Sequence, residues 1–136
     1  MNAINVYLNF NGNCREAMTF YAKCLVTPAE IMTFGDTPGD HPLELKDKVM
    51  HAKIGSGQKV LMASDFDPRQ KWQPGTNFAV VMNCESLEEI ERLYAAFSEN
   101  GTQTMPLQDT FWGARFGMLT DQFGINWMFN FDKPKQ

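Results

Sequence analysis

The two histidines, His41 and His51, are the side chains of this sequence best suited to proton transfer near neutral pH. His51 is expected in a strand, where Val49, His51 and Lys53 share one face. The opposite face is apolar and should pack against a helix, which directs His51 toward a groove or solvent. There it could donate a hydrogen bond to a substrate oxygen, act as a general base, or make only a structural hydrogen bond. His41, in a loop rich in Pro and Asp, is expected at the surface.

Amide and thioether side chains form a second candidate site. In residues 126–131, aromatic residues alternate with Asn126, Met128 and Asn130. The aromatic face should meet a helix, which leaves the amides and the methionine on the groove side, joined by Asn77 from an earlier strand. Such a lining suits a neutral polar ligand with apolar parts, because a few amides can fix its orientation. Alternatively, these asparagines lie at strand ends in water.

Trp112 and Arg115 lie at the entrance of another expected strand. Arg115 could hold a carboxylate or phosphonate through two hydrogen bonds. It could also form an ion pair with Asp109 or Asp121, and this interpretation is slightly favoured. Both Trp112 and Arg115 are therefore kept as candidate ligand-binding residues.

The composition restricts the class of partner. The chain has 136 residues, 43% of them hydrophobic, which is typical of one globular domain. A net charge of −4 without a Lys/Arg cluster argues against nucleic acid or an anionic membrane as partner. We see no secretory signal and no apolar run approaching the roughly 18 residues of a membrane span. Three cysteines without CxxC spacing indicate buried thiols in a reducing compartment, so a cytoplasmic location is expected.

The elements that would position these side chains occur twice in the same order. In the first copy, strands are expected at 4–10, 29–34, 49–54 and 60–64. A helix should begin at Asn13, which forms a capping-box pattern with Glu16, and end before Pro28. A glycine-rich turn at 55–57 joins the last two strands.

In the second copy, strands are expected at 77–83, 102–108, 114–120 and 126–131. Ser86 and Glu89 repeat the capping-box pattern, and Asn100-Gly101 ends the helix. This order predicts an α+β fold, a single domain of two βαβββ modules at about 1–65 and 76–132, with a linker at 66–75.

One module alone leaves one face of its sheet uncovered, so the second module or a partner chain should cover it. Two curved mixed sheets would then enclose a concave groove suited to a ligand. The long loop at 35–48 has only a short counterpart at 109–113. Loops of this length are often lids or binding arms; a dimer-contact arm or a mobile loop is the alternative.

Three separated segments carry a recognisable pattern. They read YLNFNGNCREA from Tyr7, VMHA and VLMASD from Val49 and Val60, and DTFWGARFG and DQFGINW from Asp109 and Asp121. Together they resemble the PhnB-like branch of the vicinal oxygen chelate superfamily. Members of that superfamily include glyoxalase I, ring-cleaving dioxygenases, fosfomycin-inactivating enzymes and bleomycin-binding proteins. The resemblance implies paired βαβββ modules and a homodimer, but the chemistry must be argued from the site.

The metal enzymes of that superfamily take His and Glu ligands from the first, fourth, fifth and eighth strands. The resemblance places at these positions Val6, Met62, Asn77 and Met128. A shift of one residue in the first strand would place Asn5 or Tyr7 there instead. None of these side chains is a usual ligand for a hard or borderline divalent metal ion. We therefore expect the family metal site to be absent.

These observations predict a metal-free protein that binds a small molecule. The candidate ligand-binding residues are His51, Met62, Asn77, Trp112, Arg115, Asn126 and Met128. The alternative is an enzyme of the same superfamily, with His51 as a base or with a metal held by other ligands. A methyltransferase, a name attached to this branch, is rejected because no Gly-rich turn with a following acidic residue is present to hold a nucleoside cofactor.

Overall fold

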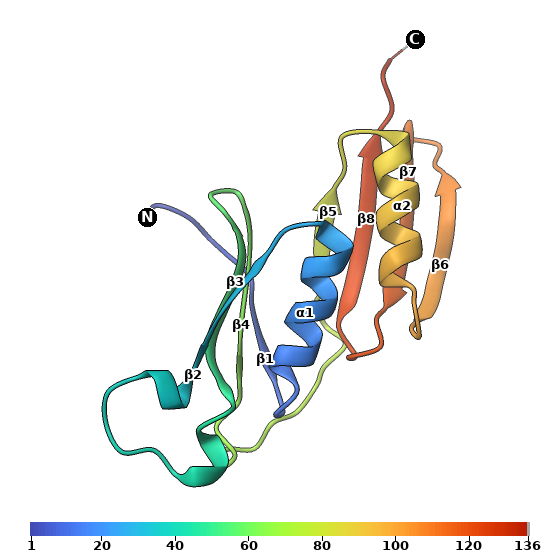
Figure 1. Cartoon of the computed structure of the whole chain (residues 1–136). Coiled ribbons are helices and arrows are strands. Elements are labelled where there is room, and N and C mark those ends of the chain that lie inside the picture. Colours follow the sequence, from blue (N-terminus) through green and yellow to red (C-terminus); the bar gives the residue numbers. More distant parts are fainter. Residues whose placement is uncertain (136) are drawn as a thin grey trace. The chain divides into compact units, whose positions relative to one another are not determined.

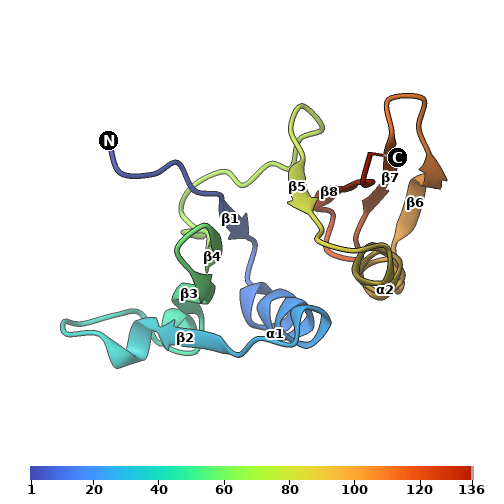
Figure 2. The same ribbon diagram turned by 90° about the horizontal axis from the view of Figure 1, so that it is seen from above.

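The computed structural model describes residues 1–135, and the chain divides into two compact units between residues 73 and 74. Each unit contains one α-helix and a four-stranded sheet, and the helix lies against one face of that sheet (Figures 1 and 2). Among the residues described, no helix combines the length and the apolar character needed to cross a membrane.

The two units repeat one topology. The first contains β1 (Tyr7–Phe10), α1 (Cys14–Leu25), β2 (Ala29–Thr33), β3 (Val49–Ser56) and β4 (Lys59–Asp65). The second contains β5 (Val80–Asn83), α2 (Leu87–Phe97), β6 (Thr102–Asp109), β7 (Ala114–Thr120) and β8 (Asn126–Asp132). The strand orders β1-β4-β3-β2 and β5-β8-β7-β6 correspond, and in both sheets only the first pair is parallel. The predicted α+β fold of two βαβββ modules is confirmed.

Helix α1 packs on its sheet through the predicted apolar stripe. Ala17 and Tyr21 are fully buried, as is Phe10 on β1. The rings of Phe10 and Tyr21 lie 6.5 Å apart between centroids. Because Leu8 and Phe10 face the helix, the alternate residues of β1 point to the other side of the sheet.

Helix α2 packs on the aromatic face of β8. The ring of Phe97 contacts Trp127 and Phe129 edge to face, with centroid distances of 4.9 and 5.6 Å. Tyr94 contacts Phe129 in the same manner at 5.5 Å. The predicted orientation of the last strand, with these aromatic residues toward the helix, is confirmed, and it fixes which of its side chains point away.

Gly117 on β7 allows α2 to approach its sheet closely. A Cβ atom at this position would lie 2.9 Å from both the Tyr94 ring and the Leu107 side chain. We expect Gly117→Ala to lower the free energy of unfolding by about 1–3 kcal/mol, because added volume in a packed core forces neighbours to shift. Urea unfolding measures this loss. Gly75→Ala is the control, since its added Cβ meets only the side-chain oxygen of Asn77, at 3.2 Å; equal losses in both variants would contradict the packing argument.

The two helices begin differently. Ser86 caps α2 as predicted, because its hydroxyl accepts a 3.0 Å hydrogen bond from Glu89 N–H, whereas the Glu89 carboxylate accepts from Glu85 N–H at 2.9 Å. At α1 the predicted capping box is wrong: the Asn13 side chain makes no capping hydrogen bond. The acceptor is instead the buried carboxylate of Asp65, whose Oδ1 accepts from Cys14 N–H at 2.9 Å. A residue at the far end of β4 thus completes the helix start.

The start of β3 departs from simple alternation. Val49 is fully buried with Ala52, on the helix side of the sheet. A register shift opposite Met32 and Thr33 places one extra residue in β3. The prediction that Val49 and His51 share a face is therefore wrong, although His51 itself does point away from the helix.

Two predicted strands are shorter at their starts. Strand β1 begins at Tyr7 and β5 begins at Val80. Asn77 consequently lies outside the fifth strand, in an exposed bend, and the prediction that it lines a groove from that strand is wrong. The first residue of β1 that points away from α1 is Tyr7, and Val6 lies before the strand.

The long loop before β3 is tied at both ends by backbone hydrogen bonds, from Phe34 N–H to Lys48 O and from Gly35 N–H to Lys46 O, both 3.0 Å. Within it, Thr37 Oγ1 lies 2.8 Å from His41 Nε2. His41 is therefore half-buried and part of the structure of the loop, more than the surface residue expected.

The predicted linker is partly attached to the first unit. Phe66 N–H donates to Phe10 O at 2.6 Å, and Trp72 Nε1 donates to Asn9 O at 2.9 Å. The indole thus supplies a donor to a carbonyl of β1, which is an edge strand of its sheet.

Candidate functional site

The first sheet has one face without a helix, which we call the first helix-free face. Its side chains alternate with the buried residues that face α1. They include Tyr7, Asn9, His51, Lys53, Met62 and Ser64. Two predicted site residues, His51 and Met62, are thus brought onto the same face.

Tyr7 and His51 form the polar centre of this face. The Tyr7 hydroxyl lies 3.1 Å from His51 Nδ1, and the rings stack with centroids 5.8 Å apart and planes inclined by 28°. Tyr7 is on β1 and His51 on β3, so the pair extends across β4, which lies between them. Sequence reasoning missed this pairing, although the alternation of buried Leu8 and Phe10 with Tyr7 was a signal for the face.

Met62 lies in register between Tyr7 and Lys53 on the neighbouring strands. Its thioether therefore adds an apolar surface between the phenol and the lysine. The Lys53 ammonium is 3.6 Å from the Glu30 carboxylate, and the two side chains are 39% and 76% exposed. The face thus combines a phenol, an imidazole, an ion pair of an ammonium group with a carboxylate, and a flexible apolar side chain.

The second sheet has an equivalent surface, the second helix-free face. It includes Val81, Asn83, Phe116, Met118, Thr120, Asn126, Met128 and Asn130. Met128 is in register with both Val81 and Met118, which makes the centre of the face apolar. Asn126 and Met128, both predicted site residues, lie here.

The amides of this face form hydrogen bonds with one another, with a hydroxyl or with a carboxylate. Asn130 Nδ2 donates to Asn83 Oδ1 at 3.3 Å, and Thr120 Oγ1 donates to Asn126 Oδ1 at 2.7 Å. Asn130 Nδ2 also donates to Asp132 Oδ1 at 3.2 Å, which uses both of its N–H donors. The oxygen of Asn130 and the Nδ2 groups of Asn83 and Asn126 can still serve a ligand.

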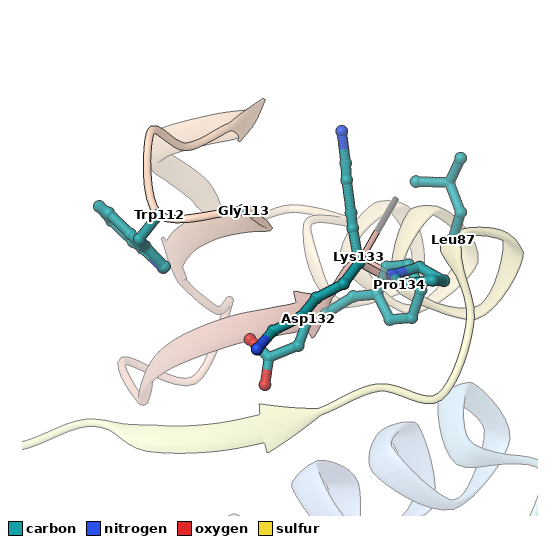
Figure 3. A pocket seen from close by; sticks show the side chains of 8 residues that line it. Leu87, Trp112, Gly113, Asp132, Lys133 and Pro134 are labelled. Atoms are coloured by element: carbon teal, nitrogen blue, oxygen red, sulfur yellow. The ribbon is translucent and has the colours of Figure 1, made fainter.

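Trp112 lies in the loop between β6 and β7 and is 58% exposed. Its ring is 6.3 Å from Phe116 of the second helix-free face. Trp112 also borders a hollow at the end of β8 (Figure 3). The residues lining that hollow are Leu87, Trp112, Gly113, Phe131, Asp132, Lys133, Pro134 and Lys135.

Arg115 lies on the other side of the sheet, toward α2. Its guanidinium contacts the carboxylates of Glu91 at 2.7 Å and Asp109 at 3.2 Å. The predicted ion pair with Asp109 is confirmed, while Glu91 was not anticipated. Hydrogen bonds from Lys133 and Arg115 hold the pKa of Asp109 below its usual value. With its charge paired twice, Arg115 stabilises the second unit and lies away from the second helix-free face.

The cysteines are poorly suited to nucleophilic chemistry. Burial, with a smaller contribution from the Asp65 carboxylate, raises the pKa of the Cys14 thiol to about 12. Burial also raises the pKa of Cys84 to about 11. Since the thiolate is the reactive form, both thiols are largely protonated at neutral pH.

The donor groups do not match the metal-ligand set of the superfamily. On β1, β4, β5 and β8, the helix-free positions carry phenol, amide, hydroxyl, thioether and aliphatic groups, with the carboxylate of Asp132 only at the end of β8. Within residues 1–135, no group of three or more His, Cys, Asp or Glu residues is arranged to hold an ion. The His and Glu set that would hold a catalytic divalent ion is therefore not provided at these positions.

Comparison with known proteins identifies the family. A family model described as 3-demethylubiquinone-9 3-methyltransferase matches residues 2–129. The chain belongs to this family. It is the PhnB-like branch of the vicinal oxygen chelate superfamily, as the resemblance in the sequence implied.

Relatives of this PhnB-like protein span nearly its whole length. Protein YjdN of Escherichia coli is 31% identical, with 97% of each chain covered. The crystal structure of PA1353 from Pseudomonas aeruginosa is 41% identical, with a TM-score of 0.84 over 97% of this chain and 100% of that one. A putative 3-demethylubiquinone-9 3-methyltransferase, PhnB protein, from Bacillus cereus is 25% identical, with a TM-score of 0.70 over 94% and 98%.

The fold also recurs in a glyoxalase/bleomycin resistance protein/dioxygenase family enzyme from Burkholderia phytofirmans. That protein is 12% identical, with a TM-score of 0.65 over 93% of this chain and 96% of that one. At this identity the likeness concerns the fold alone.

Proposed function

We propose that this PhnB-like protein binds a small organic molecule without a metal ion. The proposal depends on one observation: phenol, amide, hydroxyl and thioether groups occupy the strand positions that carry imidazole and carboxylate ligands in the metal enzymes of the superfamily. Phenol, hydroxyl and thioether groups bind hard or borderline divalent ions poorly, and a neutral amide does not replace the charge of a carboxylate ligand. These groups are well suited to orienting a neutral or weakly charged organic molecule.

The two helix-free faces favour a ligand with both polar and apolar parts. The first offers the Tyr7 hydroxyl and the His51 ring beside Met62. The second offers Met118 and Met128 bordered by amides. Methionine side chains adapt to ligands of different shape, because they are unbranched and polarisable.

Metal analysis of the full-length protein, purified without chelator, tests the metal-free part of the proposal. We expect no stoichiometric metal, and no change in melting temperature on addition of Mg²⁺, Mn²⁺, Fe²⁺, Ni²⁺ or Zn²⁺. Any ion that binds only the folded state must raise the melting temperature. Stoichiometric metal, or a rise of several degrees with one ion, would overturn the proposal. The same rise with S-adenosylmethionine would support the methyl transfer named in the family description.

A melting screen against metabolites and antibiotics tests the binding part. For any compound that raises the melting temperature, we expect Met128→Lys or Met62→Lys to weaken binding at least about tenfold, because the charge cannot be buried under an apolar ligand. Leu43→Lys is the matched control, since Leu43 is 80% exposed in the segment between β2 and β3 and belongs to neither helix-free face. Equal affinity in all three variants would show that neither helix-free face holds the ligand.

A second candidate function, an enzyme of the same superfamily, is favoured by the hydrogen bond between Tyr7 and His51. A phenol and an imidazole in contact can supply a proton to a bound substrate. Mass spectrometry of the bound compounds tests this candidate. Catalytic conversion that is abolished in His51→Gln would favour the enzyme, whereas recovery of unchanged compound would favour simple binding.

A further inference from the structure

The contact between Tyr7 and His51 bears on which imidazole nitrogen carries the hydrogen. The Tyr7 hydroxyl lies 3.1 Å from Nδ1 of His51. A neutral imidazole has one N–H donor and one acceptor nitrogen, and the hydrogen bond made by one nitrogen sets the state of the other. A phenol is a better donor than acceptor, while an unprotonated imidazole nitrogen is a strong acceptor. Donation from Tyr7 to Nδ1, with the imidazole hydrogen on Nε2, is therefore the favoured arrangement.

Protonation of the His51 ring leaves Nε2 a hydrogen-bond donor. In the imidazolium form both nitrogens carry hydrogen, so Nδ1–H donates to the Tyr7 oxygen and Nε2–H is still a donor. In either state, Nε2 has no lone pair with which to accept a proton from a ligand. The geometry thus favours His51 as a hydrogen-bond donor to a ligand over His51 as a general base.

We propose that His51 is a fixed hydrogen-bond donor that selects ligands with a carbonyl or carboxylate oxygen on the first helix-free face. This proposal rests on the proposed function, because it specifies the class of ligand bound there. Lys53, on the same face, adds an ammonium group, which is paired with the Glu30 carboxylate of the same face at 3.6 Å. The side chain of Met62, in register with Tyr7, offers an apolar surface beside this donor. An aromatic carboxylate matches this combination of groups.

Nuclear magnetic resonance measures the tautomer directly. Long-range ¹H–¹⁵N correlation of the histidine rings, recorded at pH 8, should show the Nε2–H form for His51. The signals of the other histidine are identified in His41→Gln. In Tyr7→Phe, which removes the donor to Nδ1, we expect the Nδ1–H form of His51 to gain population. A dominant Nδ1–H form in the native protein would overturn the proposal.

Two probes that share a ring but differ in charge and hydrogen bonding test the selectivity. Benzoate should shift the His51 ring signals on titration, and benzylamine, which has no acceptor oxygen and carries a positive charge, should not. His51→Leu should weaken benzoate binding about fivefold, which is the loss expected for one hydrogen bond. His51→Gln keeps a side-chain N–H donor and should retain most of the native affinity for benzoate. Circular dichroism melting confirms that each variant is folded.

The outcomes separate this inference from the proposed function. Equal shifts with benzylamine and benzoate, or no shift with either, would overturn the selection of oxygen ligands by His51. Metal-free binding would still stand if a screened compound bound through the second helix-free face. Conversely, stoichiometric metal would overturn the proposed function whichever tautomer His51 adopts.

Discussion

Replacement of Asp65 by alanine is expected to lower the free energy of unfolding by about 3 kcal/mol. The carboxylate is 7% exposed and accepts hydrogen bonds from two backbone N–H groups, Cys14 at 2.9 Å and Val49 at 2.8 Å. Alanine leaves both amide hydrogens buried without an acceptor, at about 1–3 kcal/mol each. Removal of the buried negative charge recovers part of this loss. The total for the two amides should therefore lie in the lower part of the summed range, about 2–6 kcal/mol.

Urea unfolding followed by circular dichroism measures the loss, and amide hydrogen exchange shows where it arises. Exchange should accelerate at the start of α1 and of β3, within residues 1–73, and much less in the second unit. Asp65→Asn retains one acceptor oxygen and should lose about half as much. Asp47→Ala, at an exposed position, is the control and should change stability by less than about 0.5 kcal/mol. If Asp65→Ala proved as stable as Asp47→Ala, this role of the carboxylate would be wrong.

Replacement of Asp121 by alanine should destabilise the second unit by about 3–4 kcal/mol. This carboxylate is 4% exposed and accepts from Phe123 N–H at 2.8 Å and Ile125 N–H at 3.0 Å. Its other oxygen accepts from the Trp127 indole N–H at 2.8 Å. The side chain thus holds the turn between β7 and β8 and also satisfies the largest side chain of the core.

A double-mutant cycle separates these two contributions. Trp127→Phe removes the indole N–H, so Asp121→Ala made in that background should cost about 1–2 kcal/mol less than in the native protein. Thermal or urea unfolding of the four proteins gives the coupling energy. A coupling near zero would mean that the indole hydrogen bond contributes nothing to stability, and the turn alone would account for the loss.

The order of elements could be predicted from local sequence, because each element carries its own periodic pattern. The aromatic alternation of β8 indicated its helix-facing side correctly, and so did the apolar stripe of each helix. The cap at Ser86 was also found, because its partner Glu89 is only three residues away. These features depend on neighbours in the chain, which a single sequence displays.

The features that were missed depend on residues distant in sequence. Asn13 appeared to be the cap of α1, but the acceptor comes from Asp65, across a separation of 51 residues. The β3 bulge that buries Val49 arises from pairing with β2 and leaves no local signal. Likewise, nothing near Arg115 in the sequence points to Glu91, 24 residues before it.

In the candidate site, too, local features could be predicted and contacts between distant residues could not. The direction of His51 could be inferred from alternation along its own strand. Its partner Tyr7 could not, because the two residues are 44 positions apart and meet across an intervening strand. Asn77 was misplaced because its strand begins three residues later than the apolar run suggested.

The reliance of α1 on Asp65 also orders events during synthesis of the chain. A ribosome produces α1 long before β4, so the first turn of the helix leaves the exit tunnel without its acceptor. The first unit can therefore complete its native hydrogen bonding only after residue 65 has emerged. Until then, the apolar face of α1 has no finished sheet to cover it, and a nascent chain paused before this point should be a preferred client of chaperones.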